Sequence, residues 1–123
     1  MLELRNVDAF YGQAHILHEI ALTLSAGERI AVLGRNGAGK STLLKSIMNA
    51  GPIVRGDVFF DKKPLARLSA SDRVRLGLSL VPEDRRIFTH ITVAENIRLA
   101  QSGVERKSGL PTIDEVNRIV PRL

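Results

Sequence analysis

Residues 29–42, Arg-Ile-Ala-Val-Leu-Gly-Arg-Asn-Gly-Ala-Gly-Lys-Ser-Thr, decide the fold of this chain. An apolar run leads directly into a glycine-rich loop, and the loop ends in Lys-Ser-Thr. The stretch fits the phosphate-binding pattern G-x-x-x-x-G-K-[ST], with Gly34 and Gly39 as its two glycines. We therefore predict a buried strand over 30–33, a phosphate loop, and a helix that begins near Lys40.

The residue types of this loop suit an anion. Gly37 and Gly39 can adopt backbone conformations that are closed to other residues, so successive N–H groups can curl around a phosphate. The helix that follows points free N–H groups and its positive dipole end at the same anion. Lys40 adds a mobile positive charge, and the Ser41 hydroxyl suits a metal ion. The alternative is a plain glycine turn between a core strand and a helix.

The composition is that of a globular chain. Its 123 residues are 44% hydrophobic and 25% charged, which is enough for one small domain with a real core. The absence of cysteine excludes disulfides and thiolate metal sites. No apolar stretch is long enough to span a bilayer, and no signal-peptide pattern is visible. The formal net charge is +5, but the basic residues are scattered and aromatic residues are few, so we expect no nucleic-acid partner.

Apolar periodicity predicts further strands on both sides of the loop. Alternation of apolar and polar residues over 2–6 and 16–24 predicts two strands, hence an antiparallel portion beside the main sheet. Short strands are also expected over 56–61 and 78–81.

Four helices are expected after the glycine loop. The first has an apolar face and ends at Gly51; the residues of that face are Leu43, Leu44, Ile47 and Met48. The other three are expected to begin at capping pairs, which are Ser69 with Asp72, Thr92 with Glu95, and Thr112 with Glu115. The second helix is expected to end at Gly77. The last helix has an apolar face of Ile113, Val116, Ile119 and Val120.

Three residues that resemble metal ligands have simpler interpretations. His15 and His18 lie near the start of the second expected strand, with no carboxylate or cysteine at ligand spacing, so we interpret them as ordinary strand residues. Asp61 follows a short apolar strand but has no Glu after it, and we interpret it as a turn residue.

The loop resembles the phosphate loop of ATP-binding cassette (ABC) transporter ATPases, and three further matches support the resemblance. Tyr11 stands where the family keeps an aromatic residue that stacks on adenine. Val81-Pro82-Glu83 stands at the position of the family's Q-loop. Residues 81–97 and 120–123 resemble the branched-chain amino-acid transporter subfamily. The resemblance covers the whole chain but only about the first half of the family's domain.

The resemblance implies an α/β fold of the P-loop NTPase class, ABC ATPase-like, with an N-terminal antiparallel β portion and an incomplete core. Residues 1–123 would form the N-terminal part of the ATP-binding domain. The chain has no Leu-Ser-Gly-Gly signature, no apolar strand ending in Asp-Glu and no switch His. Glu83 replaces the Gln usual in the Q-loop and adds a negative charge near the expected metal ion.

The resemblance also implies the site and its cofactors, ATP and Mg²⁺. The residues expected to hold them are Tyr11, Gly34, Arg35, Asn36, Gly37, Ala38, Gly39, Lys40, Ser41, Thr42 and Glu83. Ser41 and Glu83 are the expected Mg²⁺ ligands. No catalytic residue is expected within the chain, because the group that positions the attacking water is missing. We therefore expect the chain alone to bind ATP without hydrolysing it.

The implied function is that of the ATP-binding subunit of an importer for branched-chain amino acids. Its expected partners are transmembrane permease subunits and a second ATP-binding subunit, at the cytoplasmic face of the inner membrane. One alternative is a non-transport ABC ATPase acting in translation or DNA repair; the compact spacing from Lys40 to Glu83 favours transport. The other alternative is a truncated, non-enzymatic module that binds nucleotide.

Overall fold

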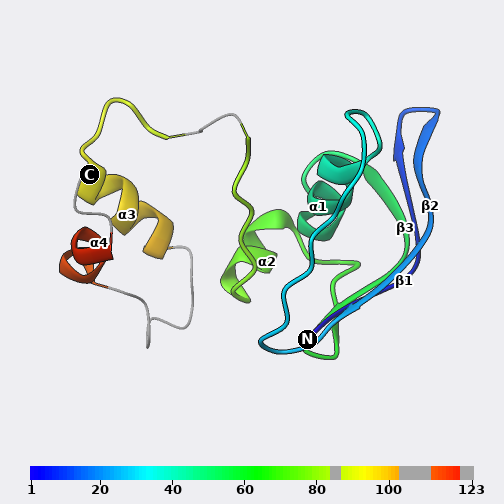
Figure 1. The fold of residues 1–123 in the computed structure, drawn as a ribbon, viewed down its shortest axis with the longest axis horizontal. Coiled ribbons are helices and arrows are strands. Elements are labelled where there is room, and N and C mark those ends of the chain that lie inside the picture. Colours follow the sequence, from blue (N-terminus) through cyan, green and yellow to red (C-terminus); the bar gives the residue numbers. More distant parts are fainter. Residues whose placement is uncertain (84–86, 103–111, 120–123) are drawn as a thin grey trace. The chain divides into compact units, whose positions relative to one another are not determined.

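The computed structural model describes residues 1–83, 87–102 and 112–119, in two compact units, Met1–Ala70 and Ser71–Leu123. The elements in chain order are β1 (Leu2–Tyr11), β2 (Ala14–Leu24), α1 (Lys40–Met48), β3 (Ile53–Phe60), β4 (Lys63–Pro64), α2 (Ala70–Arg75), α3 (Val93–Ser102) and α4 (Ile113–Ile119) (Figure 1). Of the helices in this described part, none has the length and apolar character that a bilayer crossing needs.

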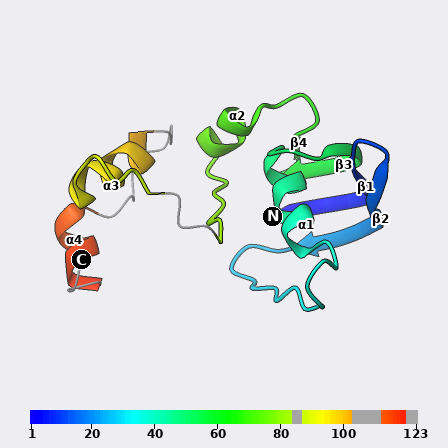
Figure 2. The same ribbon diagram turned by 90° about the horizontal axis from the view of Figure 1, so that it is seen from above.

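The first unit is an antiparallel sheet with α1 on one face (Figures 1 and 2). The strand order is β2-β1-β3-β4, and each neighbouring pair is antiparallel. This confirms the predicted antiparallel portion. The core lies between the sheet and α1; its buried apolar side chains are Leu2, Leu4, Val7, Ala9, Leu17, Leu43, Ile47, Met48, Val58 and Leu65.

A bulge in β1 explains why this strand is longer than its simple alternation predicts. Asn6 has a φ of 47° and adds one residue relative to both neighbouring strands. The extra residue shifts the alternation by one, so Leu4 and then Val7 both face the core. Gly56 lies across from the bulge with a φ of 90°, and a Cβ there would lie 2.2 Å from the Asn6 carbonyl oxygen. Only glycine fits this approach.

Helix α1 turns a face to the core that differs from the predicted one. The buried residues are Thr42, Leu43, Ser46, Ile47 and Met48, whereas Leu44 is 46% exposed, so its predicted place on the core face is wrong. The small side chains at 42 and 46 let the helix lie close to the sheet. The Ser46 hydroxyl is satisfied there, because it donates to the Thr42 carbonyl at 2.8 Å.

The two remaining predicted strands do not form. Residues 30–33 and 78–81 are not assigned to any strand and pair with none of the described strands. Leu33 is 90% and Val81 88% exposed. The apolar pattern of a buried parallel strand is present in both segments, but such a strand is stable only between neighbours that pair with it and cover both faces. The described residues supply no such neighbours.

The predicted ends of the later helices, α2 to α4, are largely confirmed. Helix α2 begins directly after Ser69, and Leu78 N–H donates to the Arg73 carbonyl at 3.1 Å around Gly77, which has a φ of 100°. Thr92 N–H donates to Glu95 Oε2 at 2.8 Å at the start of α3. In return, Glu95 N–H donates to Thr92 Oγ1, and Thr112 and Glu115 form the same two hydrogen bonds at the start of α4. The predicted apolar residue Val120 lies outside the described residues.

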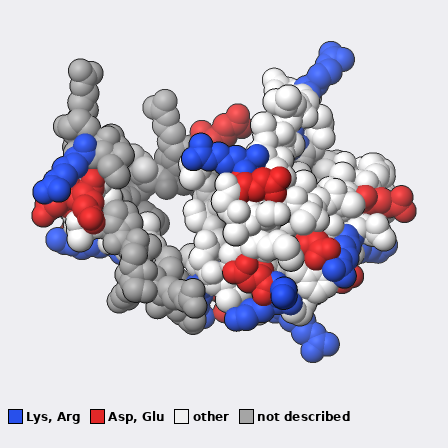
Figure 3. Space-filling model, turned by 60° about the horizontal axis from the view of Figure 1, so that its bottom comes forward, with Lys and Arg blue, Asp and Glu red and all other residues white. Residues whose placement is uncertain are grey.

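Charged side chains of both signs are interspersed on the molecular face drawn in Figure 3. Among the described residues, Arg5 pairs with Glu3 at 2.7 Å and Arg75 with Asp72 at 3.2 Å. Such exposed pairs contribute little to stability. The mixture of charges on the face in Figure 3 is that of a solvated surface, in line with the scattered basic residues of the sequence.

Candidate nucleotide-binding site

The predicted phosphate loop leads directly into α1, as expected. Gly39 is the N-cap residue, and the first helical hydrogen bond runs from Leu43 N–H to the Gly39 carbonyl at 2.9 Å. The N–H groups of Lys40, Ser41 and Thr42 precede that bond, so the helix itself offers them no carbonyl partner. Three backbone donors and the positive end of the helix dipole therefore meet at the end of the loop.

The loop glycines are required by backbone conformation and by a close contact. Gly37 has a φ of 83° and Gly39 a φ of 89°, both in the left-handed region that favours glycine. A Cβ on Gly39 would also lie 2.9 Å from Leu17 Cδ2, a side chain of β2. Strand β2 thus packs against the loop and fixes its position over the sheet.

The Lys40 ammonium lies against the start of the loop. Its Nζ donates to the Gly34 carbonyl at 2.7 Å and to the Arg35 carbonyl at 2.8 Å. The loop also contains a turn, in which Ala38 N–H donates to the Arg35 carbonyl at 3.1 Å. The lysine is therefore directed back over the loop, with its ammonium on the carbonyls of Gly34 and Arg35.

These donors fit the triphosphate of a nucleotide. The backbone N–H groups at the start of α1 can donate hydrogen bonds to an anion, and the Lys40 ammonium adds a positive charge. Ser41 is exposed, so its hydroxyl is accessible to a metal ion, whereas the Thr42 side chain is buried. The loop residues of the predicted site, 34–42, are thus brought together at one helix end.

Tyr11 and Glu83 are the two predicted site residues outside the loop. Tyr11 ends β1 and is partly exposed; its ring lies beside Gly51, where a Cβ would be 3.7 Å from Tyr11 Cε1. Gly51 follows the C-terminal end of α1, so this ring lies beside the turn that leaves the helix. Glu83 is exposed and belongs to the second unit, so its contact with Mg²⁺ stays a prediction.

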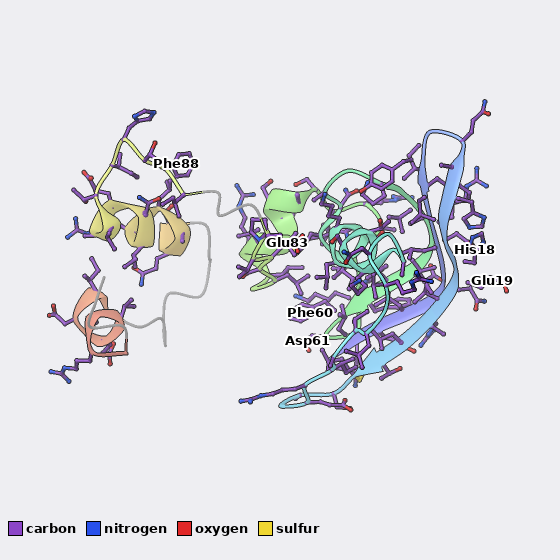
Figure 4. All side chains as sticks on the ribbon, turned by 45° about the horizontal axis from the view of Figure 1, so that its top comes forward. His18, Glu19, Phe60, Asp61, Glu83 and Phe88 are labelled. Atoms are coloured by element: carbon purple, nitrogen blue, oxygen red, sulfur yellow. The ribbon has the colours of Figure 1, made fainter. Side chains whose placement is uncertain are left out.

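Sequence reasoning missed the role of Asn96 in α3. Its side-chain amide donates to the Phe88 and Thr92 carbonyls, both at 3.0 Å, and its oxygen accepts from Phe88 N–H at 3.0 Å. The segment 88–92, which contains the Phe88 labelled in Figure 4, is thereby tied to the helix. The available signal was the residue type, since Asn is a poor helix former that favours local backbone partners.

His15 and His18 lie in β2, as predicted, but a carboxylate lies close to them in the fold. The sequence offered no carboxylate at ligand spacing, but the fold brings Asp8 of β1 to them: Asp8 Oδ1 lies 2.6 Å from His15 Nε2. Ligand atoms of the three side chains all lie within 4.8 Å of one another. The carboxylate comes from the neighbouring strand, so spacing along the chain could not reveal it.

Comparison with known proteins identifies the family. The sequence profile described as "ABC transporter" matches residues 17–121, most of the chain and the whole of the loop. The chain belongs to the ABC transporter family. This confirms the resemblance drawn from the loop and assigns the fold to the ABC ATPase type of the P-loop NTPases. ATPase activity is a general property of that family.

Three relatives of this ABC family chain illustrate the range of transport proteins that it matches. It is 32% identical, over its whole length, to the high-affinity branched-chain amino acid transport ATP-binding protein BraG of Pseudomonas aeruginosa and to a probable branched-chain amino acid transport ATP-binding protein, LivF, of Archaeoglobus fulgidus. It spans 53% and 52% of these two proteins, about half their length. It is also 35% identical to the ribose import ATP-binding protein RbsA of Yersinia pestis, over 80% of this chain and 20% of that protein.

Solved structures give the same fold assignment. The structure of an ATP binding subunit of an ABC transporter superposes with a TM-score of 0.74 at 28% identity, covering 98% of this chain and 48% of that one. A dimeric bacterial ABC transporter cassette, MJ0796, superposes with a TM-score of 0.73 at 24% identity, covering 96% and 53%. The antiparallel sheet, loop and helices described above are therefore part of an ABC cassette.

Proposed function

We propose that this chain is the nucleotide-binding part of the ATP-hydrolysing subunit of an ABC importer. The observation that carries the proposal is the loop over 34–42, with Lys40 Nζ directed over it and three backbone N–H groups at the start of α1. A site built from donors and one cation suits the phosphates of ATP, with Mg²⁺ on the Ser41 hydroxyl and Glu83. Tyr11 would stack on the adenine.

For the transported substrate we favour branched-chain amino acids. Support comes from BraG and LivF, of which the chain spans 53% and 52%, whereas it spans only 20% and 25% of two ribose import proteins that it matches at similar identity. The subunit would work at the cytoplasmic face of the inner membrane, bound to transmembrane permease subunits and paired with a second ATP-binding subunit. A ribose importer is the competing substrate class.

The ATP site is tested by titrating Mg·ATP into the purified chain and into Lys40→Ala by calorimetry. Loss of the charged partner should weaken binding by about 2–5 kcal/mol, because its contact with phosphate is charge-assisted. The matched control is Lys45→Ala, an exposed lysine in the last turn of the same helix, which should bind ATP as the wild type does. Equal affinity of wild type and Lys40→Ala would refute the phosphate-loop assignment.

The adenine contact is tested at Tyr11. If the ring stacks on the base, Tyr11→Ala should weaken ATP binding by about 1–3 kcal/mol, whereas Tyr11→Phe should preserve it, since stacking needs the ring and not the hydroxyl. The same calorimetric titration measures both. An unchanged affinity of a folded Tyr11→Ala chain would remove Tyr11 from the site.

Hydrolysis and substrate need separate experiments. We expect phosphate release by the 123-residue chain alone to stay far below about 1 s⁻¹, the low end of the typical enzyme range, because the sequence holds no candidate to position the attacking water. Turnover at that rate, lost in Lys40→Ala, would show that the chain holds its own catalytic residue.

In source cells, a Lys40→Ala allele should abolish leucine uptake and spare ribose uptake; the reverse result would favour the ribose class.

A further inference from the structure

Three metal-ligating side chains meet on the face of the β1–β2 pair that points away from α1. They are Asp8 of β1 and His15 and His18 of β2, and their ligand atoms all lie within 4.8 Å of one another. Asp8 Oδ1 lies 2.6 Å from His15 Nε2, and the two imidazole centroids are 3.7 Å apart. Figure 4 shows His18 on the side of β2 opposite α1. This Asp8–His15–His18 cluster is separate from the phosphate loop residues.

Two irregularities in the β1–β2 register bring the side chains of this cluster to one face of the sheet. In a regular strand, residues three apart point to opposite faces of the sheet. Between the pairs Ala9↔Leu17 and Phe10↔His15, however, β2 has one residue more than β1, so His15 and His18 share a face. A second extra residue of β2 lies near Glu19, which has a φ of 47°. Two irregularities therefore fall within five residues of one strand.

The cluster is held in place from both sides. At the second irregularity, Glu19 N–H donates to Asp8 Oδ1 at 3.2 Å, which fixes the carboxylate. The Phe10 ring stacks on His15 with centroids 4.2 Å apart and planes 17° apart, and the Arg55 guanidinium lies 5.0 Å from the Phe10 centroid. Ordered ligands lose little freedom when an ion binds, so this support favours binding.

We propose that Asp8, His15 and His18 form a binding site for a divalent transition-metal ion of the Zn²⁺ type. Two imidazoles and one carboxylate are ligands that Zn²⁺ prefers, and three protein ligands leave a fourth position for water or for a group from outside. The two histidines are exposed, so an ion has access from solvent. No residue of this set takes part in the proposed nucleotide site.

The rearrangement that the ion requires is small. With Zn–N and Zn–O distances of about 2.0–2.2 Å, ligand atoms of a tetrahedral site lie roughly 3.3 Å apart. The closest pair, at 2.6 Å, must therefore separate slightly, while more distant atoms within the 4.8 Å limit approach. In the metal-free protein a hydrogen bond joins His15 Nε2 and Asp8 Oδ1; on binding, the imidazole would keep its hydrogen on Nδ1, so that the Nε2 lone pair and the Asp8 carboxylate both face the ion.

The test is a Zn²⁺ titration of the 123-residue chain, with displacement of a coloured chelator as the readout. We expect one ion per chain, and a binding affinity lowered about tenfold or more in His18→Ala and in Asp8→Asn, since loss of a direct ligand should cost at least as much as loss of an outer-shell partner. The matched control is His90→Ala, which removes the one other histidine of the chain and should bind Zn²⁺ normally. Co²⁺ should give the absorption bands of a four-coordinate site in wild type and not in His18→Ala.

A thermal measurement separates loss of the site from loss of the fold. Zn²⁺ should raise the Tm of wild type and of His90→Ala, and should leave the Tm of His18→Ala unchanged while its circular dichroism spectrum in the absence of metal matches that of the wild type. The proposal is overturned if wild type takes up no Zn²⁺, or if His90→Ala loses as much affinity as His18→Ala. In the first case the cluster is only a hydrogen-bonded Asp8–His15 pair whose imidazole stacks on Phe10. In the second, the ion binds elsewhere.

Discussion

Strand β1 and the segment 30–33 both carry apolar side chains suited to a strand, yet the environments of these side chains are opposite. Strand β1 lies between β2 and β3, and its Leu4 is 2% exposed. Residues 30–33 form no strand, and Leu33 is 90% exposed. The difference shows that apolar side chains allow a segment to form a strand but do not by themselves make it one. The strand exists where neighbouring chain satisfies its N–H and C=O groups and covers its side chains.

The same contrast extends to the second unit. Helix α3 has no buried residue among those described, and its start is fixed by Thr92 and Glu95 and by the hydrogen bonds of Asn96. The antiparallel sheet with α1 is instead held by a shared apolar core. One part of the chain therefore depends on packing, and the other on local hydrogen bonds.

The largest expected effect compares Leu4 with Leu33. Truncation of Leu4 to Ala should lower the free energy of unfolding of the first unit by about 2–5 kcal/mol, the usual cost of a cavity in a packed core. Leu33→Ala should change it by less than about 0.5 kcal/mol, because an exposed side chain has little packing to lose. Urea unfolding followed by circular dichroism measures both.

A second outcome would change the comparison. If Leu33→Ala proves as costly as Leu4→Ala, residues 30–33 are buried in solution, and a second copy of the chain or another surface covers them. Measurement of the unfolding midpoint at several protein concentrations distinguishes these cases, because cover by a second copy makes the midpoint depend on concentration.

The next effect concerns the bulge that lengthens β1. Gly56→Ala would place a Cβ within 2.2 Å of the Asn6 carbonyl at a positive φ, so we expect a loss of about 3 kcal/mol in unfolding free energy. Gly12 is the matched control, since it also has a positive φ but nothing within 4 Å of its Cβ position. Gly12→Ala should cost only about 1 kcal/mol, from backbone strain alone. Equal costs would mean that the strand shifts away from Asn6.

The sequence was informative where the determinants are local. The spacing from Gly34 to Lys40 predicted a loop and the start of α1 correctly, because a glycine turn and a helix N-terminus are set by residues near one another. The capping pair of Thr92 and Glu95 was confirmed for the same reason. Leu44 was misplaced because helix periodicity marks a broad apolar stripe, and the sheet covers only part of it.

Features that depend on pairing could not be predicted. The bulge at Asn6 is defined by the residue opposite it, Gly56, fifty positions along the chain. The approach of Asp8 to His15 needs the β1–β2 register and its irregularities, which no alternation of apolar residues reveals. Within the site, Gly34–Thr42 are adjacent in sequence and were identified together. The roles of Tyr11 and Glu83 rest on the family resemblance.

The smallest effect is pH-dependent and belongs to the helices without a buried core. Hydrogen bonds from the Thr92 backbone N–H and then from its hydroxyl lower the pKa of Glu95 below its ordinary value, and Thr112 does the same for Glu115. A carboxyl group whose folded pKa is depressed stabilises the fold above its unfolded pKa, and this contribution is lost as the pH falls through the folded pKa. We therefore expect the first turns of α3 and α4 to lose helicity below about pH 4, while the core of the sheet persists.

The measurement is an NMR pH titration that follows the amide shifts of Glu95 and Asn96 in α3 and of Leu4 in β1. The variant Glu95→Gln keeps a side-chain oxygen that can accept from Thr92 N–H but has no proton to gain, so its α3 shifts should be flat over the same pH range. If the α3 shifts of wild type and Glu95→Gln change alike on acidification, the carboxylate is not what holds the helix start. If the amide of Leu4 moves together with them, the two regions unfold as one, and the contrast between a core-stabilised sheet and locally capped helices fails.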